Sequence, residues 1–160
     1  MEIITPTPQQ WDTFVAAQPR AHVLQQSAWG ELKHAYGWGV ARIAVQSESQ
    51  IIAGAQLLFR PLPLRLGTMA YLAMGPYITD NGLQPIAQID NDLWNAIHSS
   101  AHQHRAAFLK WEPGIYLPNE TAPDPTRLGF RESLQTVQPP RTVLIDIATD
   151  DDTIFARMNQ

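Results

Sequence analysis

The chain has 160 residues, 44% of them hydrophobic, and a formal net charge of -4. This length suits one domain with a substantial core. The absence of cysteine excludes disulfides, thiol catalysis and cysteine-ligated zinc within the chain, and the acidic balance argues against nucleic-acid binding by this segment alone. No apolar run approaches the roughly 20 residues that cross a membrane, and the first ten residues lack a basic-then-apolar signal. We therefore expect a cytoplasmic protein.

The N-terminal residues predict a strand followed by a helix. Residues 2–5 form the expected strand. Thr7 is a suitable helix cap and Pro8 suits the first helical position, and Pro19 ends the segment. Apolar residues of this helix recur at helical spacing: Trp11, Phe14 and Val15.

A second amphipathic helix is expected between Ser27 as its cap and Gly37 as its left-handed stop. Lys33 follows Trp29 by four residues, so the two side chains share a face of this helix. Taken alone, the pattern is typical of a core helix whose lysine reaches out to solvent. The predicted buried stripe consists of Ala28, Leu32, Ala35 and Tyr36, with Trp29 at its edge.

Three strands are expected next. Apolar segments at residues 41–46 and 51–59 are joined by a short hairpin-like connection. A third strand covers residues 69–72 and ends before Gly75-Pro76, and residues 80–82 form a turn.

The C-terminal half predicts a helix over residues 90–105, with Asp90 as its cap and a buried face of Leu93, Ile97 and Ala101. Strands follow at residues 108–111 and 142–147. Thr149 then caps a last helix with acidic residues in its first turn.

This order of elements, β-α-α-β-β-β-α-β-(α)-β-α, indicates one mixed sheet in an α/β or α+β domain. A helix pair, a three-strand meander, a helix and a strand make up the order of the GCN5-like N-acyltransferase fold. A topological match of this kind carries no function by itself. The last helix stops about ten residues after it begins, so we expect residues 1–160 to be a single subdomain of a longer protein.

Coenzyme A is not expected to bind. Acyl-CoA-dependent transferases of this fold hold the pyrophosphate on backbone amides of a glycine-rich turn before a helix. The corresponding segment here, residues 73–90, has no Gly-x-Gly run, and Pro76 lacks a backbone donor where one is needed.

A metal site is also not expected. His98 and His102 lie one turn apart on the solvated face of their predicted helix, with no glutamate between them as the zinc pattern His-Glu-x-x-His requires. His104 falls near the apolar side, where a structural role is commoner.

Glu112 and Arg141 are candidate catalytic or binding residues, because Glu112 follows one predicted strand and Arg141 precedes another. Glu112 could act as a general base at a sheet edge. Alternatively, Lys110 and Glu112 form a charged pair on the solvent side of a strand whose Trp111 faces the core. Arg141 follows two prolines and could point into a cleft to bind a diphosphate or a carboxylate, or it could form an exposed salt bridge.

Together these stretches resemble the Fem family, the FemABX peptidyltransferases that build interpeptide bridges in bacterial peptidoglycan. Members have two tandem acyltransferase-like subdomains, and this chain resembles the first. The resemblance runs through five segments in order: HVLQQSAWGELKHAYGW (22–38), IIAGAQLLFRPLP (51–63), YLAMGPYITD (71–80), FLKWEP (108–113) and LGFRES…QPPRTVLIDI (128–147).

The resemblance implies an enzyme that transfers an amino acid from aminoacyl-tRNA to the peptide of a UDP-linked or lipid-linked muropeptide. Lys33 matches a lysine that contacts the precursor's diphosphate in relatives, and Tyr71 and Asp80 match residues near the cleft. With Arg141, these are the predicted substrate-binding residues. Met74 stands where relatives often carry arginine, which weakens anion recognition by that loop.

Most tRNA contacts and the residues that drive transfer lie in the second half of such proteins, so this chain alone is expected to be inactive. Two other functions remain open: a non-catalytic module that binds a glycolipid or peptide, and an amino-acid N-acyltransferase outside cell-wall synthesis.

Overall fold

The computed structural model describes residues 1–79, 85–115, 125–139 and 148–158. The chain divides into two compact units, Met1–Pro123 and Asp124–Gln160. The turn expected at residues 80–82 and the strand expected at 142–147 lie outside the described residues.

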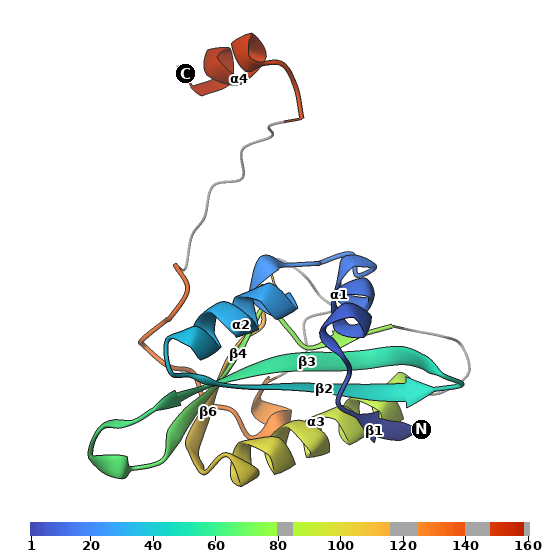
Figure 1. Ribbon diagram of the computed structural model, residues 1–160, viewed down its shortest axis with the longest axis vertical. Helices are drawn as coiled ribbons and strands as arrows, with labels where there is room; N and C mark the ends of the chain where they lie inside the picture. The colour runs from blue at the N-terminus through green and yellow to red at the C-terminus, as the bar shows by residue number, and fades with distance from the viewer. Residues whose placement is uncertain (80–84, 116–124, 140–147, 159–160) are drawn as a thin grey trace. The chain divides into compact units, whose positions relative to one another are not determined.

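The first unit is built on one mixed sheet in the order β1-β2-β3-β4-β6, with the short β5 paired to β3 (Figure 1). All neighbours are antiparallel except β4 and β6, which run parallel across the connection through α3. The expected strands are confirmed in the described residues, and β5 is an addition. The bounds are β1 Glu2–Ile4, β2 Gly39–Ser47, β3 Gln50–Pro61, β4 Thr68–Ala73, β5 Tyr77–Ile78 and β6 Ala106–Glu112.

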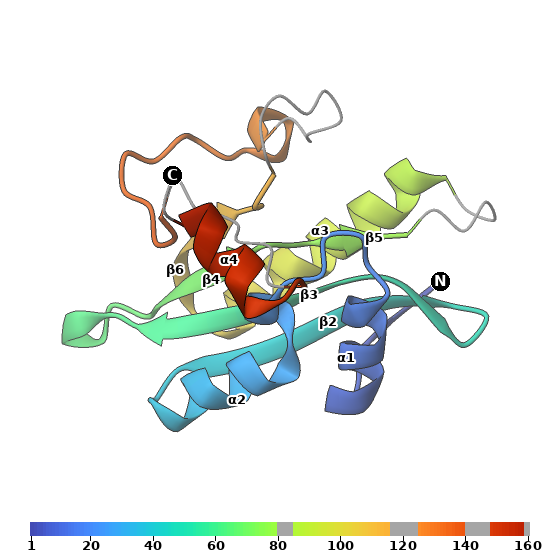
Figure 2. The ribbon, with the colours of Figure 1, turned by 90° about the horizontal axis from the view of Figure 1, so that it is seen from above.

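Helices cover both faces of this sheet. Helices α1 (Pro8–Ala16) and α2 (Ser27–Ala35) lie side by side on one face, and α3 (Ile86–Gln103) lies on the other (Figures 1 and 2). A single 3-10 turn, η1 (Val23–Gln25), leads into α2. No helix in the described segments is long and apolar enough to cross a membrane.

Helix α1 begins and packs as its sequence predicts. Thr7 and Gln10 form a reciprocal capping box, which satisfies two backbone donors at the helix start. The Trp11 ring is buried over β3, where a Cβ added to Gly54 would lie only 2.6 Å from it. Glycine at position 54 therefore lets α1 approach the sheet closely.

Helix α2 has the predicted extent, but its predicted buried face is wrong. Leu32 is 47% exposed and Tyr36 77% exposed, whereas Ser27 and Gly30 are buried. Ala28 and Ala35 are also exposed. Gln26, not Ser27, holds the N-cap position.

Polar and small residues explain this rotation of α2. The Ser27 hydroxyl and backbone amide both donate to the Asp12 carboxylate of α1. A Cβ on Gly30 would lie 2.6 Å from Gln56 Oε1, so the helix approaches β3 at this position. These contacts turn the small residues inward, and Gly37 with φ of 80° ends the helix as predicted.

Helix α3 begins four residues before the predicted cap at Asp90. Pro85 occupies the N-cap position. Asp90 is inside the helix, where its carboxylate is hydrogen-bonded to the Trp94 side chain and burial raises its pKa. Because the buried Ile89 continues the apolar face of Leu93 toward the N-terminus, the helix is longer than the cap residue alone suggested.

In the second unit, the described elements are the 3-10 turn η3 (Pro125–Leu128) and helix α4 (Asp151–Met158). Asp150, not the predicted Thr149, caps α4. Its carboxylate accepts hydrogen bonds from the Thr153 backbone N–H at 3.0 Å and hydroxyl at 2.8 Å. These bonds favour the charged form and lower the pKa of Asp150.

Candidate functional site

Lys33 lies between two aromatic rings at the end of α2. Its Nζ is 4.6 Å from the centroid of the Trp29 ring and 5.3 Å from that of Trp38. The first contact follows from the i, i+4 spacing on the helix, and both are cation–π interactions. Within the described segments, no carboxylate forms an ion pair with Lys33.

Arg60 brings a second cation to the same place. It lies near the end of β3, is exposed, and places its guanidinium carbon 5.7 Å from the Trp38 centroid. It also lacks an ion pair with any carboxylate of the described parts of the chain. Two like charges that share one ring repel each other unless an anion lies near both, so this arrangement suits an anionic ligand.

An apolar cluster connects the Lys33 site to Tyr71. The described structure therefore brings two of the four predicted site residues, Lys33 and Tyr71, to the same side of the sheet. Asp80 and Arg141 lie outside the described residues. The buried members of the cluster are Leu24, Leu58, Tyr71 and Ala73, and the partly buried members packed on them are Trp29, Trp38, Val40, Met69 and Met74.

Tyr71 donates a hydrogen bond from Oη to Glu112 Oε2 at 2.6 Å. The parallel register sets Tyr71 opposite Lys110 and Ala73 opposite Glu112. Glu112 Oε1 also lies 3.9 Å from Lys110 Nζ, and the Lys110 and Glu112 side chains are only 14% and 16% exposed. The interpretation of these two residues as a solvent-side pair is therefore wrong.

The same interpretation placed Trp111 toward the core, and this part is confirmed, because Trp111 points to the face of the sheet opposite Lys110 and Glu112. Its indole donates to Gly75 O at 2.6 Å and packs edge-on against Trp94 of α3. Glu112 is thus a mostly buried carboxylate beside a phenol and an ammonium. Such a carboxylate can orient an incoming amine and accept its proton.

Two buried glutamines fix the site's elements to one another. The Gln25 amide donates to Ala73 O at 2.6 Å and to Gln56 O at 3.2 Å, and its oxygen accepts from Gln56 N at 2.7 Å. The Gln56 side chain in turn donates to Gln26 O at 2.8 Å. Since β3 and β4 pair directly only from Leu58 onward, these side chains bridge the strands where they separate and hold the entry of α2 against them.

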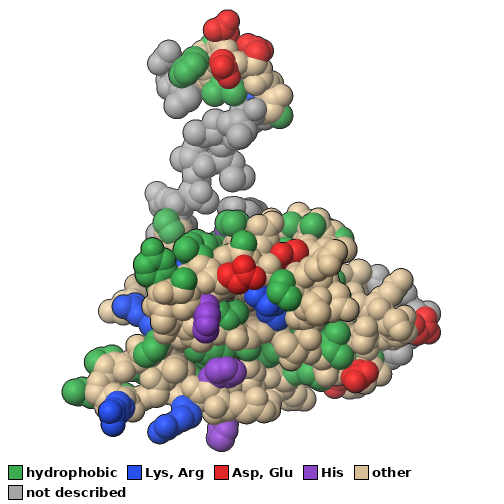
Figure 3. Space-filling model, in the orientation of Figure 1, with side chains coloured by type: hydrophobic (Ala, Val, Ile, Leu, Met, Phe, Trp, Pro, Cys, Tyr) green, Lys and Arg blue, Asp and Glu red, His purple; other side chains and the backbone are tan. Residues whose placement is uncertain are grey.

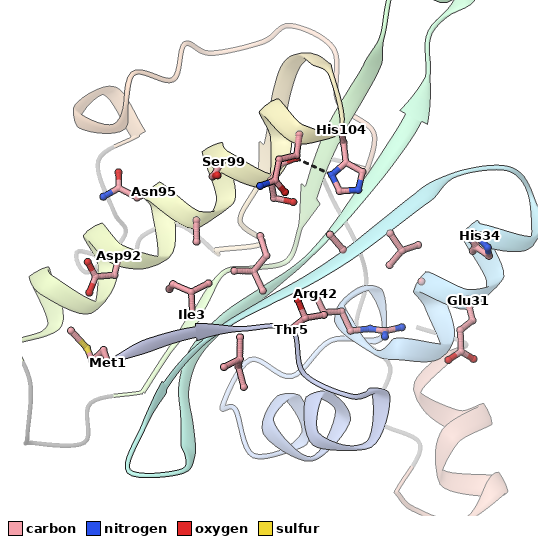
Figure 4. Close-up of a pocket in the computed structure, with 18 residues that line it drawn as sticks. Met1, Ile3, Thr5, Glu31, His34, Arg42, Asp92, Asn95, Ser99 and His104 are labelled. Carbon is pink, nitrogen blue, oxygen red and sulfur yellow. Dashed lines mark hydrogen bonds between the residues drawn. The ribbon is translucent and has the colours of Figure 1, made fainter.

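A separate pocket of about 1000 Å³ lies at the β1–β2 edge between α2 and α3 (Figure 4). Glu31, Arg42 and Asp92 are among the residues that line it, whereas Lys33 and Tyr71 are not. His104, at its rim, stacks on Phe59 with ring centroids 3.9 Å apart. The described residues contain no group of three His, Cys, Asp or Glu that could hold a metal ion.

Comparison with known proteins decides the family. A family model described as FemAB matches residues 7–132. The chain belongs to the FemAB family. This FemAB chain is 31% identical over 172 residues to a lipid II:glycine glycyltransferase of Staphylococcus saprophyticus, a match that covers 100% of this chain and 40% of that protein. A Staphylococcus aureus protein of the same name is 30% identical, with the same coverage. The FemAB chain thus spans about two fifths of the length of these relatives.

Solved structures support the same family and fold. The structure of FemX matches with a TM-score of 0.65 and 30% identity, covering 76% of this chain and 29% of that one. A probable acetyltransferase matches with a TM-score of 0.61 and 12% identity, covering 90% of this chain and 100% of that one. The predicted GCN5-like fold of this FemAB chain is confirmed.

Sequence reasoning missed Arg60 and the bond between Tyr71 and Glu112. Arg60 stands in the segment FRPLP (59–63), directly after an apolar run, and this cation at the end of a buried strand was the signal that could have indicated it. The bond between Tyr71 and Glu112 depends on the register of β4 and β6, which no local pattern reveals.

Proposed function

We propose that the full-length protein transfers an amino acid from aminoacyl-tRNA to the peptide of a peptidoglycan precursor, and that this chain supplies the precursor-binding part. The observation that carries the proposal is the pair of cations around Trp38, beside the buried pair of Tyr71 and Glu112. Relatives named lipid II:glycine glycyltransferase support a lipid-linked precursor over a UDP-linked one. Because the donor is aminoacyl-tRNA, the reaction belongs to the cytoplasmic side of the membrane.

In this proposal the precursor's diphosphate lies against Lys33 and Arg60, whose charges it neutralises. Either a UDP-linked or a lipid-linked precursor presents this group. The peptide then passes along the apolar cluster toward Tyr71 and Glu112. Asp80 and Arg141 remain predicted contacts with the precursor.

The chemical step is attack of the peptide's amine on the aminoacyl ester. A C–N bond forms, the ester C–O bond breaks, and the tRNA hydroxyl leaves with the proton that the amine gives up. In this proposal Glu112 receives the proton of that amine, with Tyr71 orienting the carboxylate. Positioning and charge neutralisation supply most of the acceleration, and coenzyme A has no part because the ester itself is the acyl donor.

The test is titration of the full-length protein with UDP-MurNAc-pentapeptide and with a lipid-linked precursor. Lys33→Met keeps much of the side-chain packing but removes the charge, and we expect precursor affinity to fall about tenfold or more, as for loss of one charge-assisted contact. Arg60→Gln should weaken binding in the same direction.

Glu31→Gln is the matched control, because it changes one charge on α2 at a residue that lines the separate pocket. Its affinity for the precursor should equal that of the wild type. Equal binding by wild type and Lys33→Met would remove the proposed role of Lys33. Precursor binding without any transfer from aminoacyl-tRNA would instead favour a non-catalytic binding module.

A further inference from the structure

The turn between β3 and β4 exposes two leucines to solvent. Leu64 is 90% exposed and Leu66 64% exposed, which is unusual for neighbouring leucines at a narrow tip. Leu64 and Arg65 both have positive φ, at 56° and 59°, a backbone conformation that costs energy for side chains other than glycine. We call residues 60–67 the β3–β4 tip.

Backbone hydrogen bonds define the shape of the β3–β4 tip. Leu62 N donates to Gly67 O at 3.0 Å, and Leu66 N donates to Pro63 O at 3.2 Å. These bonds close the turn around the 3-10 element η2 (Pro63–Arg65). The leucines therefore project from an ordered turn, directed outward by its backbone.

Positive charge surrounds these leucines. Arg60 and Arg65 belong to the tip, and Arg105 lies beside it because its carbonyl accepts a hydrogen bond from Thr68 N at 3.1 Å. All three arginines are exposed. No Asp or Glu occurs in residues 49–79 or in residues 98–105 at the end of α3, although the whole chain has a net charge of -4.

The space-filling view shows the same combination. At the end of the first unit where Figure 1 draws the β3–β4 turn, hydrophobic and basic side chains lie together without acidic ones (Figure 3). The tip is narrow and convex, whereas stable protein interfaces need a broad complementary area. Free phosphate would account for the arginines but would leave the leucines in water.

We propose that the β3–β4 tip docks on an anionic lipid membrane, with Leu64 and Leu66 entering the interfacial region and Arg65 and Arg105 contacting lipid phosphates. Peripheral membrane attachment commonly combines a modest apolar anchor with basic residues, because each alone gives only weak, reversible binding. The inference goes beyond the proposed function and does not depend on the transfer reaction. It would place the Lys33 and Trp38 site near headgroup level, since Arg60 contacts Trp38 from the same tip.

The experiment is co-sedimentation of the full-length protein with vesicles that contain no peptidoglycan precursor. Vesicles of phosphatidylglycerol and phosphatidylcholine should bind the protein, vesicles of phosphatidylcholine alone should bind it less, and added salt should weaken the binding. Leu64→Ser with Leu66→Ser should lower the partition coefficient about tenfold or more. Arg65→Gln should lower it about fivefold on anionic vesicles.

The control is Val23→Ser with Leu32→Ser, which removes two apolar side chains that are 55% and 47% exposed elsewhere on the first unit. This variant should bind vesicles as the wild type does. Circular dichroism melting of all variants checks that they fold.

Absence of wild-type binding to anionic vesicles, or equal binding by the double-serine tip variant, would overturn the proposal. A tip that instead contacts a second copy of the protein would reveal itself by a changed oligomeric state in the double-serine variant, without vesicle binding by the wild type. Failure of the proposed function is a different result: transfer to both UDP-linked and lipid-linked acceptors would be absent while binding to precursor-free vesicles persists.

Discussion

Gln25 illustrates how one uncharged residue can set the geometry around the proposed site. Its amide makes three hydrogen bonds to the β3 and β4 backbone, at Gln56 N, Gln56 O and Ala73 O. Its own carbonyl accepts from the Trp11 indole. The described residues contain no buried side-chain nitrogen or oxygen without a partner, so this network is complete and sensitive to any loss.

Gln25→Leu should therefore lower the free energy of unfolding by about 3 kcal/mol, because three buried backbone groups lose their partner. Urea unfolding followed by tryptophan fluorescence measures this. Gln26→Leu is the matched control, since Gln26 makes no side-chain cap bond and should change stability by less than about 0.5 kcal/mol. Equal losses in the two variants would show that the network does not stabilise the fold.

The short contact between Tyr71 and Glu112 leads to a prediction about the chemical step. Glu112→Gln keeps the size and the hydrogen bond from Tyr71 but removes the base, so single-turnover transfer by the full-length protein should slow about 100-fold. Precursor affinity should stay within about twofold. The opposite split, with weaker binding and an unchanged rate, would make Glu112 a substrate-holding residue instead of a base.

At the scale of elements, local signals predicted where α2 ends, but not its N-cap residue or the face that it buries. The helix stop at Gly37 and the shared face of Lys33 and Trp29 depend only on residues within the helix, and both are confirmed. The rotation depends on Asp12 and Gln56, which lie far away in the sequence. Hydrophobic periodicity cannot detect a helix held by a polar anchor and a close-packed glycine.

For helix α3 and the strands, too, local patterns predicted most elements but not all of their bounds. The apolar pattern located α3, but the helix begins before Asp90, whose carboxylate is hydrogen-bonded to Trp94 instead of capping. Strand β5 has two residues, too few for a period to be visible. Among the residues of the proposed site, the sequence pointed to Lys33 and Tyr71, whereas Arg60 and the Tyr71–Glu112 bond required the fold.

At the scale of the whole molecule, the fold does not determine the acyl donor. A fold of this kind hosts more than one chemistry, so the donor depends on the groups that surround the site. In the present chain the parallel pair β4–β6 stays hydrogen-bonded to its end, at Ala73 and Glu112. Beyond it, Met74 N donates to Glu112 O at 2.7 Å and the Trp111 indole donates to Gly75 O. Backbone groups that follow β4 are thus already engaged within the protein.

We therefore predict that the full-length protein binds acetyl-CoA no more tightly than about 1 mM, as measured by isothermal titration calorimetry. Pro76 lacks the N–H that a pyrophosphate cradle would use, and Pro85 occupies the N-cap of α3. Because coenzyme A also carries a diphosphate, weak binding at Lys33 and Arg60 is expected, and it should vanish in Lys33→Met and at high salt. Micromolar binding that survives Lys33→Met would instead indicate a dedicated coenzyme A site, and the donor would then have to be an acyl thioester in place of an aminoacyl ester.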